Sequence, residues 1–223
     1  MCSSDLRAPA RTLPIGSPMP LGAFALVPSG LLLSALQLGW LASSDRRAVA
    51  FILLGFAVPL QLVSSVFAFL SRDALVGTSF GIFAGIWLAF ALTEISGSVG
   101  QTSHVLGIFF LACGALFILL VGGGFAGGKV GAGAVILAGS ARFVLSGIYE
   151  LSADSAVEDA AGIVGLAFVC VAAYVGLATV LEDSARRLGL PLGRRGVARA
   201  ALAGRLDDQL RELEHEAGVR QQL

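Results

Sequence analysis

The chain of 223 residues is poor in charge and in the side chains that carry enzyme chemistry. Asp, Glu, Lys and Arg make up 13% of it, well below the roughly 25% of a soluble domain. Its 15 basic residues are balanced by 15 acidic ones, so there is no positive surplus for binding nucleic acid. Its two histidines and three cysteines do not cluster with acids at metal-site spacing, and no serine lies in a nucleophile motif. We therefore expect neither an enzyme nor a protein with a metal ion or cofactor.

Hydrophobic residues, by contrast, make up 56% of the chain, and its mean hydropathy is +0.85. About 20 consecutive apolar residues are enough for a helix to cross a bilayer. Six runs meet this length: 21–42, 48–70, 74–92, 105–124, 130–151 and 160–181. The composition and these runs predict an all-α integral membrane protein, a six-transmembrane-helix bundle with short loops that leave no room for a soluble domain between the spans.

The six runs divide the chain into three parts. Residues 1–20 form a head, 21–181 the transmembrane domain, and 182–223 a tail. In the tail we expect an amphipathic helix at about 197–217, because leucines recur there every three or four residues among charges. Such a helix suits either a short coiled coil or a position along an anionic lipid surface.

The distribution of basic residues predicts the orientation of the chain. Lys and Arg outside the spans favour the cytoplasmic side. Nearly all of them fall on the side of the two termini, whereas the other side has only Arg46 and Arg47. We therefore expect both termini in the cytoplasm and a multi-pass protein of a cytoplasmic (inner or plasma) membrane.

The chain has 29 glycines, and many lie inside the expected spans. Gly81 and Gly85 are four residues apart, and Gly162 and Gly165 are three apart. Because small residues let helix backbones approach closely in lipid, these pairs predict tight helix packing.

The start of the first span carries a recognisable motif, made of Ser17, Pro18, Met19, Pro20, Leu21 and Gly22. It resembles the Asn-Pro-Ala-Pro-Leu-Gly signature of the acetate/succinate uptake transporter family (AceTr). Further matches follow at consistent spacing: Gln61, Thr78-Ser79-Phe80, Trp87-Leu88, Gly107, Gly114 and Val180-Leu181-Glu182. The chain departs from the family at Ser17, where the signature has asparagine, and after the fourth span, where the Gly-Thr-Leu-Lys segment is not kept. The resemblance extends from about residue 18 to about 190.

This resemblance implies a six-helix protein that moves acetate and related small monocarboxylates, coupled to protons, through a pathway within each protomer of a ring-like homo-oligomer. The family narrows that pathway with an aromatic residue of span one, an aromatic of span three and a leucine of span five. An alignment without gaps puts these positions at Leu26, Phe83 and Ala138, although Phe24 also suits the first. Since alanine is smaller than leucine, the resemblance implies a wider constriction and a solute bulkier than acetate.

Helix geometry extends this constriction to further residues. Arg142 lies about 6 Å beyond Ala138 and about 40° around the helix, and Ser146 and Tyr149 continue the same face. On span three, Trp87 and Glu94 share a stripe with Phe83, so Glu94 is expected at the outer mouth.

Arg142 is the one charge deep inside an expected span. Buried arginines in membranes face protein or water and usually have a function. Arg142 therefore either attracts a substrate carboxylate, which the guanidinium binds with two prongs, or forms a structural ion pair with Glu94 or Glu150. Gln61 similarly contacts substrate or water, or joins two helices, and Trp87 belongs either to the pathway or to the packing.

The function expected from the sequence is a carrier or channel for small monocarboxylates, whose partners are the carboxylate anion, the lipid bilayer and further copies of the chain. The alternative is a non-transporting six-helix scaffold or stress-related protein whose glycines serve packing alone.

Overall fold

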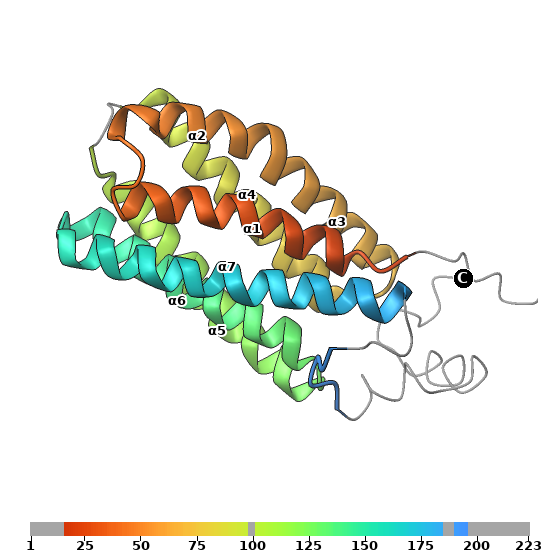
Figure 1. Cartoon of the computed structure of the whole chain (residues 1–223). Coiled ribbons are helices and arrows are strands. Elements are labelled where there is room, and N and C mark those ends of the chain that lie inside the picture. The colour runs from red at the N-terminus through yellow and green to blue at the C-terminus, as the bar shows by residue number, and fades with distance from the viewer. Residues whose placement is uncertain (1–15, 98–100, 185–189, 196–223) are drawn as a thin grey trace, which may run out of the picture.

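The computed structural model describes residues 16–97, 101–184 and 190–195, and helices dominate this part of the chain (Figure 1). Its elements in order are α1 (Met19–Gln37), η1 (Ser43–Asp45), α2 (Arg46–Ile52), η2 (Leu53–Ala57), α3 (Val58–Leu70), α4 (Ala74–Ser96), α5 (His104–Ala126), α6 (Val130–Ser152) and α7 (Ser155–Ser184). Elements η1 to α3 form one continuous span, so six helical segments of this part are long and apolar enough to cross a membrane. The predicted six-helix membrane fold is confirmed; the tail helix expected at 197–217 lies outside the described residues.

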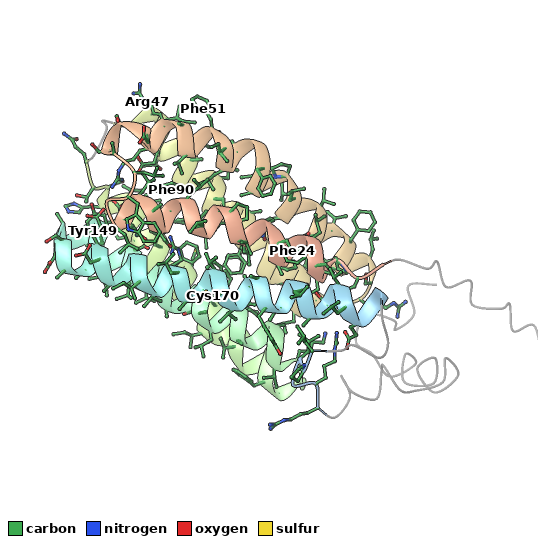
Figure 2. The ribbon with its side chains drawn as sticks, viewed as in Figure 1. Phe24, Arg47, Phe51, Phe90, Tyr149 and Cys170 are labelled. Atoms are coloured by element: carbon green, nitrogen blue, oxygen red, sulfur yellow. The ribbon has the colours of Figure 1, made fainter. Side chains whose placement is uncertain are left out.

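The helices run up and down, so α1, α4 and α6 begin at one end of the bundle, where α7 ends (Figure 1). We call this the terminal end, and the end where α1, α4 and α6 finish the distal end. Helices α1 and α7 lie side by side along the bundle, and α5 packs along α6 (Figure 1). Because the bundle has lipid rather than water around it, large apolar side chains such as Phe51 point outward, whereas Phe90 lies inside (Figure 2).

The second span contains a π-helical turn at Leu53–Ala57, directly before Pro59. Proline has no backbone N–H, and its ring clashes with the carbonyl four residues earlier, here that of Gly55. The wider π turn relieves this clash, and the span continues through the proline to Leu70.

Two helix ends differ from the predicted runs. Helix α1 stops at Gln37 rather than 42, because Gly39 adopts a left-handed conformation (φ 67°) and the Trp40 amide bonds back to the Ala35 carbonyl. Helix α7 starts at Ser155 rather than 160, because the Asp154 side chain accepts the Ala156 amide at 2.8 Å. Its acidic first turn, with Glu158, is favourable at a helix N-terminus although it is not apolar.

The predicted glycine packing is observed at Gly162 and Gly165, where an added Cβ would overlap neighbouring side chains. At Gly81 a Cβ would come within 3.1 Å of the Ser65 hydroxyl oxygen, whereas at Gly85 it would meet open space. Gly85 therefore packs against no helix among the described residues.

Candidate functional site

Among the cavities of the described residues, two that are lined by both α4 and α6 lie at opposite ends of the bundle. The cavity at the terminal end has a volume of about 90 Å³, and the one at the distal end about 200 Å³. Their linings reach Val76 and Thr93 on α4 and Ala132 and Glu150 on α6. At 1.5 Å per residue, about 25 Å of helix separates them. This is nearly the thickness of the hydrocarbon core, about 30 Å, so the two cavities face opposite surfaces of the membrane.

The terminal cavity is built from the signature segment and from two charged pairs. Ser17 and Pro18 line it, together with Lys129 and Arg194. The Lys129 ammonium pairs with Asp73 at 2.7 Å, and Arg194 pairs with Glu182 at 2.6 Å. Both cations of this cavity therefore already have a carboxylate partner.

Residues 190–195, which we call the strap, form one wall of this terminal cavity through Leu192 and Arg194. Besides the Arg194–Glu182 pair, three further hydrogen bonds in the described part of the chain fasten the strap. Tyr174 donates its hydroxyl to the Pro191 carbonyl at 2.9 Å, the Gly131 amide donates to Leu192 O at 3.1 Å, and the Arg195 amide donates to Gly128 O at 3.0 Å. The strap thus closes over the start of α6.

The distal cavity is acidic. Glu94 and Glu150 line it, and both are buried. Arg46 pairs with Glu94 at 3.1 Å and with Glu158 at 3.5 Å, while Glu150 accepts the backbone amide of Ser103 at 2.7 Å. Glu94, which we expected at the outer mouth, lines this cavity at the distal end of the bundle. Arg46 thus pairs with two of the three carboxylates, and the third, Glu150, is held by a backbone amide.

Tyr149 lies at the same distal end (Figure 2) and is 9% exposed. Its hydroxyl lies near the charged groups of Glu158 and Arg46. Its side chain therefore belongs to the acidic cluster of the distal cavity.

Between the cavities, four phenylalanines from four helices form an aromatic cluster. Phe83 of α4 lies at its centre, with ring centroids 4.5 Å from Phe117, 6.1 Å from Phe143 and 5.7 Å from Phe168. All four rings are fully buried. Tilted aromatic pairs at these separations attract one another beyond their hydrophobic burial, so the cluster stabilises the packing of these four helices.

The residues expected at a constriction lie at or near this cluster. Leu26 is fully buried, and Phe83 is the central ring of the cluster. Ala138 is half-buried, and its neighbour Gly139 lies directly against Phe83, where an added Cβ would lie 2.8 Å from the ring. Helix α6 therefore presents only backbone to the ring at Gly139.

Arg142 is fully buried in the middle of α6. Its Nη1 donates to the Ser34 hydroxyl at 2.8 Å, and its Nη2 donates to the Gln37 side-chain oxygen at 3.3 Å. The Gln37 amide nitrogen in turn donates to the Ser146 hydroxyl at 3.0 Å. Helices α1 and α6 thus hold the guanidinium with neutral groups only.

One edge of the Arg142 guanidinium has unused hydrogen-bonding capacity. Nε and Nη2 form the edge that binds a carboxylate with two prongs. Within the described residues Nε has no hydrogen-bond partner, and Nη2 has only the long bond to Gln37. This edge has the donor pattern that a small carboxylate requires.

The structural alternative for Arg142, an ion pair with Glu94 or Glu150, is not observed. In the part of the chain that the structure describes, no carboxylate lies within ion-pair distance of Arg142, because Glu94 pairs with Arg46 and Glu150 bonds to Ser103. The buried positive charge of Arg142 is therefore uncompensated within this part of the chain.

Gln61 joins two helices, one of the two interpretations that the sequence left open. It is fully buried, and its amide nitrogen donates to the carbonyl of Gly22, in the signature, at 2.8 Å. Gly22 itself must lack a side chain, because a Cβ there would lie 2.3 Å from the Phe80 ring. Among the described residues, the Gln61 oxygen and the Trp87 indole nitrogen are buried without a hydrogen-bond partner.

Sequence reasoning missed the partners of Arg142, namely Ser34, Gln37 and Gly165. Ser34 and Gln37 are polar residues three apart inside an otherwise apolar run, which puts them on one helix face. That spacing was an available signal. The three other rings of the aromatic cluster gave no signal, because phenylalanine is common throughout the spans.

This chain is similar to a known protein family and to a solved structure. A model of the GPR1/FUN34/yaaH family matches residues 3–192. Among solved structures, the bacterial acetate channel SatP is similar to this chain, with a TM-score of 0.71 and 20% sequence identity over 80% of this chain and 99% of that one. No curated protein sequence matches. The chain therefore belongs to the GPR1/FUN34/yaaH family, an acetate transporter family, which confirms the resemblance that its signature carries.

Proposed function

We propose that this protein is a channel or carrier for small monocarboxylates such as acetate, with a pathway through each protomer. The pathway runs from the distal cavity past Arg142 and the aromatic cluster to the terminal cavity. Membership of a transporter family excludes an enzyme and supports transport. The similar fold of SatP, itself an acetate channel, supports a small carboxylate as the solute.

The observation that carries the proposal is the uncompensated guanidinium of Arg142. An arginine in the middle of a bilayer costs at least about 2.5–3.5 kcal/mol. Ser34 and Gln37 give it hydrogen bonds but no negative charge. A carboxylate at the open Nε–Nη2 edge would supply both a charge and two hydrogen bonds, so the site favours an anion of this shape.

The charge of the interior also selects among carboxylates. A single guanidinium compensates one negative charge, so a dicarboxylate such as succinate would keep a second, unpaired charge in a low-dielectric region. Ala138 is smaller than the leucine of the family's constriction, so we expect a longer alkyl chain to be accepted. We therefore expect propionate and butyrate to compete better than succinate.

Proton coupling and orientation belong to the same proposal. With the terminal end in the cytoplasm of a cell membrane, uptake of an anion against the potential costs about 2.3 kcal/mol per 100 mV. Co-transport of one proton would cancel this cost. A ring-like assembly of several protomers would give each copy its own pathway.

The test is uptake of labelled acetate into proteoliposomes, with and without an inward proton gradient. The variant is Arg142→Gln, and Arg47→Gln is its matched control, because Arg47 is exposed at the surface of the bundle (Figure 2). We expect gradient-driven uptake by the wild type and by Arg47→Gln, and none by folded Arg142→Gln. Normal uptake by Arg142→Gln would exclude a role of Arg142 in transport. Folded wild-type protein that takes up no carboxylate would instead support the alternative, a non-transporting scaffold.

A further inference from the structure

Helix α7 passes so close to Arg142 that the guanidinium occupies the space of a missing side chain. A Cβ atom built on Gly165 would lie 1.4 Å from Nη1 and 2.6 Å from Cζ of Arg142, and 2.3 Å from the Ser34 hydroxyl oxygen. No real Cβ comes within 3.0 Å of such atoms. Any residue with a side chain at 165 would therefore displace the guanidinium or the helix.

Gly165 also lies against Ser34, the hydrogen-bond partner of the guanidinium. Ser34 donates its hydroxyl hydrogen to the Gly30 carbonyl at 2.8 Å, so its oxygen can only accept from Arg142. This hydroxyl lies against Gly165. The backbone of α7 at Gly165 thus lies against both the donor and the acceptor of the Arg142–Ser34 hydrogen bond.

Confinement of the guanidinium determines which of its edges is free. With Nη1 held between Gly165 and Ser34, Nε and Nη2 are the donors left for another partner. To clear a Cβ at 165, Nη1 would have to move from 1.4 Å to at least 3.0 Å. That movement exceeds the tolerance of a hydrogen bond, so both the Ser34 bond and the direction of the open edge would be lost.

We propose that Gly165 is a positioning residue for substrate binding: its missing side chain forms the slot that holds the Arg142 guanidinium with its Nε–Nη2 edge free for a carboxylate. This inference rests on the proposed function. Gly165 does not touch the substrate; it acts through Arg142 and Ser34.

Another glycine of α7 provides a matched control. Gly176 faces α1 as Gly165 does, and a Cβ there would lie 3.0 Å from the ring of Phe24. It is eleven residues further along, about 16 Å down the helix axis. Gly176→Ala therefore tests tight α1–α7 packing away from the guanidinium.

The experiment measures KM and maximal rate of acetate uptake in proteoliposomes for Gly165→Ala, Gly176→Ala, Arg142→Lys and the double variant Arg142→Lys/Gly165→Ala. The Arg142→Lys variant is an informative background for Gly165→Ala, because the lysine ammonium has no Nη1 to occupy the slot beside residue 165. We expect Gly165→Ala to raise KM by about tenfold to a hundredfold, the loss of one charge-assisted hydrogen bond, with Gly176→Ala near wild type. In the Arg142→Lys background, Gly165→Ala should change KM by less than about twofold, because the interaction it disrupts is already absent.

Each outcome decides between the proposals. If Gly165→Ala raises KM equally in both backgrounds, or if its KM equals that of the wild type, Gly165 does not act through the guanidinium. If Gly165→Ala alone fails to fold but the double variant folds, the slot is supported; if neither folds, glycine is required for helix packing and the positioning role is wrong. Failure of the proposed function is separate, since it appears as normal uptake by Arg142→Gln whatever the result at Gly165.

Discussion

Loss of Arg46 should destabilise the protein far more than loss of its neighbour Arg47. The side chains of Arg46 and Glu94 are 11% and 8% exposed, and the pair is 3.1 Å apart. The variant Arg46→Gln would leave Glu94 buried without a cation, and Glu158 would lose the same partner. Removal of one member of a buried ion pair costs about 3–5 kcal/mol, because the other charge stays desolvated.

The assay is thermal unfolding of the purified protein in detergent. For a chain of this size, about 3–5 kcal/mol corresponds to a fall in Tm of roughly 6–20 °C. Arg47→Gln, on the exposed surface next to it, should change the free energy of unfolding by no more than about 0.5 kcal/mol. The double variant Arg46→Gln/Glu94→Gln should recover most of the loss, because two neutral amides replace an unpaired charge. Equal Tm values for Arg46→Gln and Arg47→Gln would show that the pair contributes nothing, and the reasoning from burial would be refuted.

Two further variants test the middle of the bundle and the strap. Phe83→Ala removes the central ring of the aromatic cluster, so we expect the free energy of unfolding to fall by about 3–5 kcal/mol. We also expect the ratio of butyrate uptake to acetate uptake to rise. An unchanged ratio would mean that the solute does not pass Phe83. Tyr174→Phe deletes the hydroxyl that donates to Pro191 O, a hydrogen bond that contributes about 0.5–1.5 kcal/mol to stability. Because the Gly131 amide bonds to the strap at Leu192 O, we expect hydrogen exchange of this amide to become faster. Exchange at the wild-type rate would show that the strap is held without this bond.

The charges of the two mouths differ in a way that matters for transport. At the terminal cavity Lys129 and Arg194 are each matched by one carboxylate, whereas at the distal cavity Arg46 is shared between Glu94 and Glu158, and Glu150 lies beside them without an ion pair in the described part of the chain. An anion entering from the distal side would thus approach an acidic surface before it reached Arg142. A proton carried with the anion would lower that barrier, which agrees with the proposed coupling.

The sequence by itself determined the number and order of the membrane helices. Hydropathy is a local property, and a run of about 20 apolar residues has few alternatives to a spanning helix because lipid offers no hydrogen bonds to an irregular backbone. The same local reasoning identified Arg142 as the deep charge and put Glu94 at a mouth of the bundle. It failed at helix ends: the left-handed Gly39 stops α1 within an apolar run, and the Asp154 cap starts α7 before its apolar run begins.

Only the tertiary structure decided which side chains meet. Arg142 bonds to Ser34 and Gln37, more than a hundred residues away in the chain, and not to the carboxylates considered from the sequence. Such contacts depend on how each helix is rotated and how closely two helices approach, and a single sequence does not specify either quantity. Gly165 is an example. In the sequence it is one of 29 glycines, whereas in the structure the Arg142 guanidinium occupies the space that a side chain at this position would take.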